Sequence, residues 1–349
     1  MGVGADSEGW DLIADSAFVT VGESAASMAA VEDGRAPSAE YAVLRKSHFS
    51  KVVAMMDTRF DPGQRAASAR FAAHAYRATW DYPNVYIGEE FPGIQYLTIH
   101  AALRRPKHIA MLVHNTASLR RRLPLSTLGL GRLVDHWLCL SQKSKMDLET
   151  RYGVPSKQIT VVGSRVDTCF FSPDADAEVR MQICSAGAVN RDYATLIAAA
   201  EPLGVELKIA ADTAWRYTAS NEAQQIVPEF VEMRSWGDYT NLRDLYASSA
   251  VVVVPLAKPS LSGVTVLLEA MAMARPIIVT RNAYIEDFVK DGDNCLLVPP
   301  GDSEAMRQKI RYLLDHPDKA SDLGIRAREW VLERFTVEHY VSKILSVWQ

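Results

Sequence analysis

The stretch of sequence that decides the fold is Val251-Val-Val-Val-Pro-Leu-Ala-Lys-Pro-Ser-Leu-Ser-Gly-Val-Thr-Val-Leu-Leu-Glu-Ala-Met-Ala-Met-Ala-Arg-Pro-Ile-Ile-Val-Thr280. Its pattern predicts a strand over 251–255, a Ser/Gly loop, a helix over 266–274 and a second strand over 276–280. Near-continuous apolar composition, as in the first of these strands, is typical of a parallel sheet covered on both faces. The stretch therefore predicts an α/β fold.

The same alternation of apolar strands and helical stretches runs outward in both directions, which predicts parallel sheets with crossover helices. The predicted strands cover residues 17–21, 41–44, 52–56, 85–88, 108–113, 136–140, 159–162, 182–185, 206–210, 251–255, 276–280 and 295–298. The predicted helices cover residues 64–82, 143–152, 193–200, 241–248, 266–274, 303–315 and 322–335.

Length and composition narrow the class of protein. The 349 residues are enough for two domains, and 48% hydrophobic with 23% charged residues excludes disordered and fibrous classes. A net charge of −4 argues against a nucleic-acid-binding protein. No apolar run reaches the roughly 18 residues of a membrane span. The first residues lack the basic start of a signal peptide, so we expect a cytoplasmic protein. The four scattered cysteines predict neither disulfides nor a zinc site.

A polar, Pro-containing segment at 172–178 is the predicted domain boundary. We expect two doubly wound, Rossmann-like domains over residues 1–175 and 176–336, and a last helix over 337–349 that packs back on the first domain. Ligands of such sheets bind outside the carboxyl ends of the strands. The predicted site therefore lies in a cleft between the two domains.

The loop before the helix at 266–274 has the composition of a phosphate site. Ser262, Gly263 and Thr265 are small, and the amides at a helix start suit an anion. Glu269, one turn further, could accept hydrogen bonds from a ribose diol. The residues alone leave a second interpretation open. In it, a Ser or Thr caps the helix, and the helix dipole stabilises an acidic residue in the first turn.

The stretch 251–280 resembles the donor-binding signature of the retaining glycosyltransferases with the GT-B fold, glycosyltransferase family four. Four further segments resemble that family in the same order along the chain. They are residues 159–173, 186–193, 290–302 and 333–336. The resemblance is strong from about residue 133 onward and faint before it.

The resemblance implies that residues 1–175 form the acceptor side and residues 176–336 bind a nucleotide-sugar donor. It implies donor contacts from Gly187, Ser262, Gly263, Val264, Thr265, Val266 and Glu269, with Glu269 on the ribose. It also implies catalytic roles for His114, Arg191 and Glu269. In this interpretation Arg191 stabilises the leaving diphosphate, so that neither a metal nor a cofactor is expected beyond the nucleotide sugar, whose base stays unknown. The alternative for Arg191 is an ion pair with Asp192.

On the acceptor side, His114 ends a predicted strand, where the family often has a histidine that reaches the sugar or acceptor. Asn115 is a second polar candidate. Glu89 and Glu90 follow another predicted strand, and because adjacent strand residues point to opposite faces, we expect at most one of them at the site. A structural hydrogen-bonding role for His114 remains open.

Several positions depart from the family pattern: Leu261 replaces a first Glu, Ala188 a basic residue, Ala274 a Gly, and Ser164-Arg165 the usual Asn-Gly. Metal-independent transfer of a hexose to a hydroxyl-bearing small-molecule, glycan or lipid-linked acceptor is the leading hypothesis. The first two departures support an alternative, a non-catalytic GT-B module that binds nucleotide or saccharide, or that partners an active enzyme. An epimerase or phosphorylase is a weaker option.

Arg120, Arg121 and Arg122 precede the apolar segment 123–133. Such a basic patch can contact an anionic membrane surface. A solvated loop that leads into a core helix is the competing interpretation.

Overall fold

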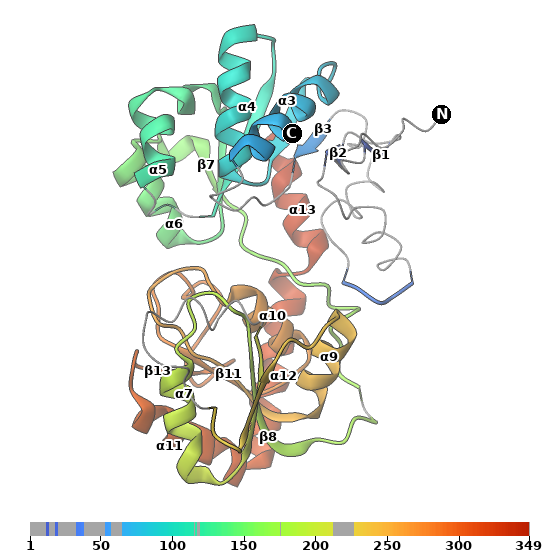
Figure 1. Ribbon diagram of the computed structural model, residues 1–349, viewed down its shortest axis with the longest axis vertical. Coiled ribbons are helices and arrows are strands. Elements are labelled where there is room, and N and C mark those ends of the chain that lie inside the picture. Colours follow the sequence, from blue (N-terminus) through green and yellow to red (C-terminus); the bar gives the residue numbers. More distant parts are fainter. Residues whose placement is uncertain are drawn as a thin grey trace. The chain divides into compact units, whose positions relative to one another are not determined.

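The computed structural model describes residues 12–13, 18–19, 33–37, 53–56, 65–114, 116, 119–174, 176–211 and 227–348. Its contacts divide these residues into two compact units (Figure 1). Unit 1 takes the described residues up to Gly163, except 33–37, together with those from Glu338 onward. Unit 2 takes residues 33–37 and Ser164–Val337.

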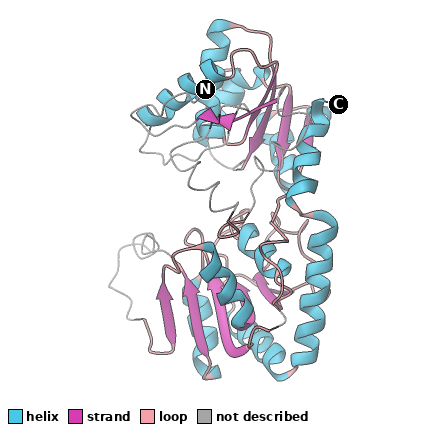
Figure 2. Cartoon of the chain, turned by 90° about the vertical axis from the view of Figure 1, so that its right-hand side faces the viewer, coloured by secondary structure: helices cyan, strands magenta, loops and turns pink. Residues whose placement is uncertain are grey.

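Unit 2 is built on a parallel sheet of six strands in the order β10-β9-β8-β11-β12-β13. Figure 2 draws strands of this sheet as magenta arrows. The strands are β8 (Arg180–Ala186), β9 (Glu206–Ala210), β10 (Val231–Arg234), β11 (Ser249–Val254), β12 (Ile277–Thr280) and β13 (Leu296–Val298). The chain order reverses between β8 and β11. In a doubly wound sheet this switch point is where a ligand binds, at the carboxyl ends of the two strands.

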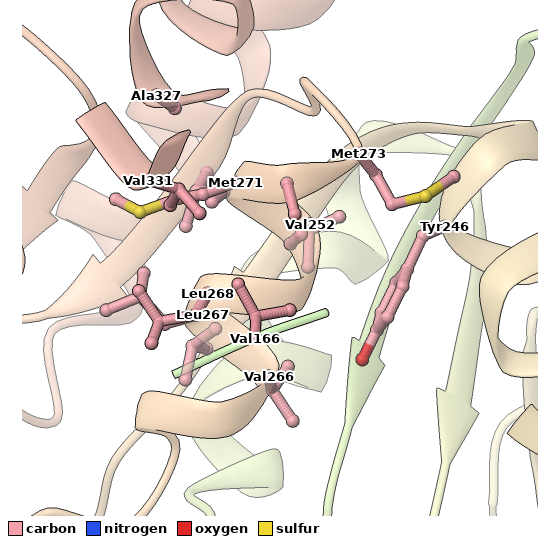
Figure 3. Packing of buried hydrophobic residues seen from close by; sticks show 14 of the residues in the cluster. Val166, Tyr246, Val252, Val266, Leu267, Leu268, Met271, Met273, Ala327 and Val331 are labelled. Carbon is pink, nitrogen blue, oxygen red and sulfur yellow. The ribbon is translucent and has the colours of Figure 1, made fainter. Parts of the chain in front are cut away.

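Helices cover both faces of this sheet. They are α7 (Tyr193–Ala200), α9 (Tyr239–Ser248), α10 (Val264–Ala272), α11 (Ser303–Asp315) and α12 (Pro317–Arg334). One core joins α9, α10 and α12 to side chains such as Val252 of β11 (Figure 3), and the other joins α7 and α11 to side chains such as Val251. The alternate residues of β11 thus point into different cores, as its all-apolar sequence predicts.

The described strands of unit 1 follow one another in chain order, from β1 to β7. They are β1 (Leu12–Ile13), β2 (Phe18–Val19), β3 (Val53–Met56), β4 (Asn84–Ile87), β5 (His108–Val113), β6 (His136–Cys139) and β7 (Ile159–Val161). All neighbouring pairs are parallel except β1 with β2. The reversal typical of a doubly wound sheet is therefore present in unit 2 and is not among the described strands of unit 1. The strand predicted at 41–44 lies outside the described residues.

The helices of unit 1 are α3 (Arg65–Ala78), α4 (Glu90–Leu103), α5 (Leu119–Arg122), α6 (Gln142–Asp147) and the last helix, α13 (Val337–Leu345). The sequence does not predict helix α4, because Pro92 and Gly93 interrupt the helical pattern of apolar residues. Pro92 lies in the first turn, where a missing N–H costs nothing. A Cβ atom at Gly93 would lie 2.7 Å from Cγ2 of Ile87, so glycine lets α4 approach β4 closely.

The division between the units lies earlier than the predicted boundary after residue 175. Val166 N donates to Phe335 O at 2.8 Å, and Phe170 and Phe171 belong to a core of unit 2. The last helix returns to unit 1, where the hydroxyls of Tyr340 and Tyr86 lie 3.4 Å apart.

Candidate nucleotide-binding site

The loops that follow β8 and β11 meet at the switch point of unit 2. Arg191 and Leu256 form an isolated antiparallel bridge between them, and Asp192 N donates to Pro255 O at 3.1 Å. Asn190 strengthens the junction, since its Nδ2 donates to the Ser260 hydroxyl at 2.8 Å. The sequence segments 186–193 and 251–280, both singled out above, therefore form one structure.

Arg191 carries a guanidinium that is buried against both loops, with 9% of the residue exposed. Its Nε donates to Ala186 O and its Nη1 to Val189 O, each at 2.9 Å. A Cβ atom at Gly187 would overlap Nη2, and one at Gly263 would lie 3.5 Å from Nη1. Both glycines have positive φ, 101° and 96°, which other residues rarely adopt. Glycine at position 187 gives the guanidinium its space, whereas a Cβ atom at Gly263 would crowd Val254 and Leu256, at 2.9 and 3.0 Å.

The charge of Arg191 is not neutralised by Asp192, as one sequence interpretation held. Asp192 instead caps α7, accepting a hydrogen bond from Thr195 N at 3.1 Å. Among the described residues, no carboxylate lies within ion-pair distance of Arg191. Burial lowers the pKa of Arg191, although a guanidinium stays protonated in proteins. A buried cation of this kind favours an anionic ligand.

Helix α10 begins beside this cation, where Val264 N donates to Leu261 O at 3.2 Å and Leu267 N donates to Gly263 O at 2.8 Å. Its N-cap is Gly263, and no side chain caps the helix. The interpretation of the loop as a Ser or Thr cap is therefore wrong. Ser262 donates its backbone N–H to the Ser260 hydroxyl at 3.1 Å, and the Val264 side chain packs into the core.

Glu269 is a buried carboxylate with a specific partner. Because α10 begins at Val264 and not at Val266, Glu269 lies in its second turn, which corrects the predicted first-turn placement. The Tyr246 hydroxyl donates to Oε2 of Glu269 at 2.9 Å. Burial raises the pKa of Glu269 from 4.5 to about 7, opposed by this hydrogen bond and by the charge of Arg191.

A pocket of about 290 Å³ opens at this point of unit 2. Of the predicted donor-contacting residues, Gly187, Thr265, Val266 and Glu269 line it. Ser262, Gly263 and Val264 are not among its described lining residues, although Gly263 lies next to Arg191.

Residues 235–239, which follow β10, also line the pocket. The sequence pattern did not identify them as site residues. The Arg234 guanidinium stacks on the Trp236 ring, 3.9 Å from its centroid. Asp238 caps α9 by accepting from Asn241 N at 2.9 Å. The sequence signal for these lining residues is the Gly237-Asp238 pair after a segment that alternates apolar and charged residues. Because β10 is partly exposed, its sequence lacks the continuous apolar run of a buried strand.

In unit 1, the structure brings His114, Glu89 and Glu90 together. His114 follows β5 directly, and its Nδ1 lies 3.8 Å from Glu89 and 3.7 Å from Glu90. Glu90 also accepts from His114 N at 2.7 Å. The argument from strand alternation fails, because β4 ends at Ile87 and α4 begins at Glu90, and both carboxylates lie beside His114. Strand alternation does not apply there.

These three side chains also have one ligand-type atom each within 4.8 Å of one another, an arrangement that could hold a metal ion.

Asn115 lies outside the described residues. Arg120 is exposed on α5, and Leu123 and Leu128 beyond it are 57% and 69% exposed. Among the described residues, no helix combines the length and apolar character that crossing a membrane requires.

Comparison with known proteins finds a family match that includes most of the residues lining the pocket. Residues 189–316 match the model of the family described as Glycosyl transferases group 1. N-acetyl-alpha-D-glucosaminyl L-malate synthase of Bacillus anthracis is 33% identical over 112 residues, which cover 32% of this chain and 29% of that protein. The chain thus spans less than a third of the length of this curated relative.

Solved structures resemble the chain over most of its length. A glycosyltransferase from Rickettsia africae ESF-5 aligns with a TM-score of 0.67 and 15% identity, covering 95% of this chain and 96% of that one. Alr3699/HepE of Anabaena, in complex with UDP, aligns with a TM-score of 0.69 and 16% identity, covering 84% and 85%. The predicted α/β fold of the GT-B type is confirmed. The chain therefore has the GT-B fold, and its residues 189–316 match the family model of the group 1 glycosyltransferases.

Proposed function

We propose that the protein is a glycosyltransferase whose unit 2 binds a nucleotide diphosphate sugar and transfers the sugar to a hydroxyl-bearing acceptor. The observation that carries the proposal is the Arg191 guanidinium, buried, without a described carboxylate partner, and lying against Gly187 and Gly263. A diphosphate supplies the anion that this cation lacks, and its oxygens match the planar guanidinium fork.

The remaining parts of the donor fit around that contact. The first-turn amides of Thr265 and Val266 add donors to the diphosphate, since no side chain caps α10. Glu269, in the wall of the same pocket, accepts from the ribose hydroxyls. The base then extends toward residues 235–239. The similar HepE structure contains UDP, which supports a uridine nucleotide as the first to test.

In the transfer step, Arg191 and the start of α10 stabilise the charge that develops on the leaving diphosphate. This positive charge makes the reaction independent of a divalent metal. We further propose that the reaction transfers a hexose with retention of configuration. His114, with Glu89 and Glu90 beside it, contacts the sugar or the acceptor hydroxyl. The exposed Arg120 and Leu123 are the candidates for peripheral membrane contact.

A binding screen tests the proposal. UDP-, GDP-, ADP- and dTDP-sugars are added in turn while the melting temperature and donor hydrolysis are followed. A true donor raises the melting temperature in a concentration-dependent way, by mass action. Hydrolysis should persist in EDTA, and loss with EDTA that magnesium or manganese reverses would contradict the metal-independent mechanism. Failure of all four donors to bind would contradict the proposed function. Binding without hydrolysis or transfer would favour the non-catalytic module.

A further inference from the structure

We propose that Tyr246 is a positioning residue, which fixes the carboxylate of Glu269 so that one of its oxygens is presented to the ribose hydroxyls of the donor. The inference rests on the proposed function, since it takes Glu269 as the ribose ligand. It adds a residue from α9, an element that contributed no predicted site residue.

The contacts of Tyr246 leave its side chain little freedom. The residue is fully buried, in a core that also contains Val252 (Figure 3). Phe171 belongs to the same core. The rings of Tyr246 and Phe171 have centroids 6.3 Å apart. Because close packing fixes the ring, its hydroxyl is a fixed donor, which lies 2.9 Å from Oε2 of Glu269. A carboxylate has several acceptor positions. With Oε2 held by Tyr246, Oε1 remains for a ligand in the pocket that Glu269 lines.

The hydroxyl also affects whether the carboxylate is ionised. Burial raises the pKa of Glu269 to about 7, and the groups that oppose this rise are Tyr246, from α9, and Arg191, from the loop after β8. Cys184 of β8 faces Tyr246, and Tyr193 of α7 faces Arg191. A hydrogen bond donated to the ionised form favours that form. Loss of the Tyr246 hydroxyl should therefore raise the pKa of Glu269 further. Because the ionised carboxylate is the stronger acceptor for the diol, donor affinity then requires a higher pH.

The test is the affinity for UDP-glucose, or for whichever of the four sugar nucleotides the wild-type protein binds, measured by calorimetry from about pH 6 to about pH 9. For Tyr246→Phe we expect about tenfold weaker binding near pH 7, recovery at higher pH, and a pH midpoint raised by about one unit. Tyr96→Phe is the matched control. It removes a buried hydroxyl of unit 1, 2.7 Å from the Thr79 hydroxyl, and should leave the profile unchanged.

Two further variants separate the possible failures. Glu269→Gln cannot titrate, so its binding should be weak and independent of pH with or without Tyr246→Phe. If Tyr246→Phe, shown to be folded by its melting curve, binds like wild type or is weakened equally at every pH, the positioning role is overturned. The proposed function would still stand if Glu269→Ala loses affinity. Retention of full affinity by Glu269→Ala would overturn both.

Discussion

Two buried carboxylates, Glu269 of unit 2 and Glu90 of unit 1, lie in helices that follow strands of parallel sheets, yet their surroundings differ. Glu269 accepts from a tyrosine hydroxyl and faces the Arg191 cation. Glu90 accepts from the backbone of His114 and lies beside its imidazole and Glu89. The first environment is suited to recognising a diphosphate and a diol. The second, with an imidazole between two carboxylates, is suited to hydroxyl or proton chemistry. The comparison predicts that changes in unit 2 affect donor affinity, whereas changes in unit 1 affect turnover.

The largest expected effect is on turnover in His114→Ala. We expect the transfer rate to fall about 100-fold or more, with nucleotide affinity nearly unchanged, because a positioned acid–base group contributes about that much. The check is steady-state kinetics beside calorimetry. His108→Ala, at the opposite end of the same strand and exposed, is the control. Equal losses of rate and affinity would remove the proposed division of roles between the units.

Arg191→Met should weaken nucleotide diphosphate binding by about 100- to 1000-fold, since two charge-assisted hydrogen bonds, each worth about 1.5 to 3 kcal/mol, are lost and partly replaced by hydrogen bonds to water. Arg191→Lys should recover part of the loss, because an ammonium keeps the charge but not the fork. Arg281→Met is the control in unit 2, where an exposed arginine also follows a strand and pairs with Asp291 at 3.3 Å. Titration calorimetry at constant ionic strength is the measurement. Comparable losses in Arg191→Met and Arg281→Met would mean that charge alone, and not this site, binds the anion.

Glu269→Gln should stabilise the fold above neutral pH. Burial raises the pKa of Glu269 from 4.5 to about 7, so the folded state binds the proton more tightly than the unfolded chain. The contribution of this carboxyl to the free energy of unfolding therefore falls as pH rises from about 4.5 to about 7. The amide, which can still accept from Tyr246, avoids that loss. We expect a gain of about 1 to 3 kcal/mol at about pH 8 and little difference at about pH 5, by urea unfolding. A destabilised variant at the higher pH would contradict the burial cost.

The smallest effect concerns the turn behind α10, where Ala274 has a φ of 53°. A residue with a side chain loses about 1 to 2 kcal/mol of stability in this conformation, and glycine avoids that cost. Glycine also raises the entropy of the unfolded chain, which offsets part of the gain in stability. Ala274→Gly should therefore add up to about 1 kcal/mol of stability in urea. Ala270→Gly, inside α10, should have the opposite sign. Destabilisation by Ala274→Gly would show that the turn is not strained.

Much of unit 2 could be predicted, because its elements are apolar runs bounded by clear breaks. The predicted strand 206–210 and helices 193–200 and 303–315 agree with β9, α7 and α11 at both ends. The pairing of Arg191 with the loop before α10 also followed, through two motifs at neighbouring strand ends. The strand β10 could not be predicted. It is an edge strand whose apolar and charged residues alternate and whose side chains are partly exposed.

The environment of the carboxylates could not be predicted. That Glu89 and Glu90 lie together beside His114 depends on the start of α4 at Glu90, a helix that the sequence pattern does not predict. The start of α10 two residues earlier than predicted moved Glu269 into the buried second turn. Its contact with Tyr246 joins α9 to α10 through the core, and no local pattern reports such a contact.

The central claim, that Glu269 holds the donor ribose, is tested most directly with a nucleotide that lacks the diol. Calorimetry compares UDP with 2′,3′-dideoxy-UDP, or the equivalent pair of the base that the screen selects, on the wild-type protein and on Glu269→Ala. We predict that the wild type binds the complete nucleotide about 30- to 1000-fold more tightly than the variant does, from the loss of two charge-assisted hydrogen bonds partly replaced by water. The dideoxy nucleotide should bind both proteins alike. If folded Glu269→Ala still distinguishes the two nucleotides as the wild type does, the ribose is held elsewhere and the placement of the donor is wrong.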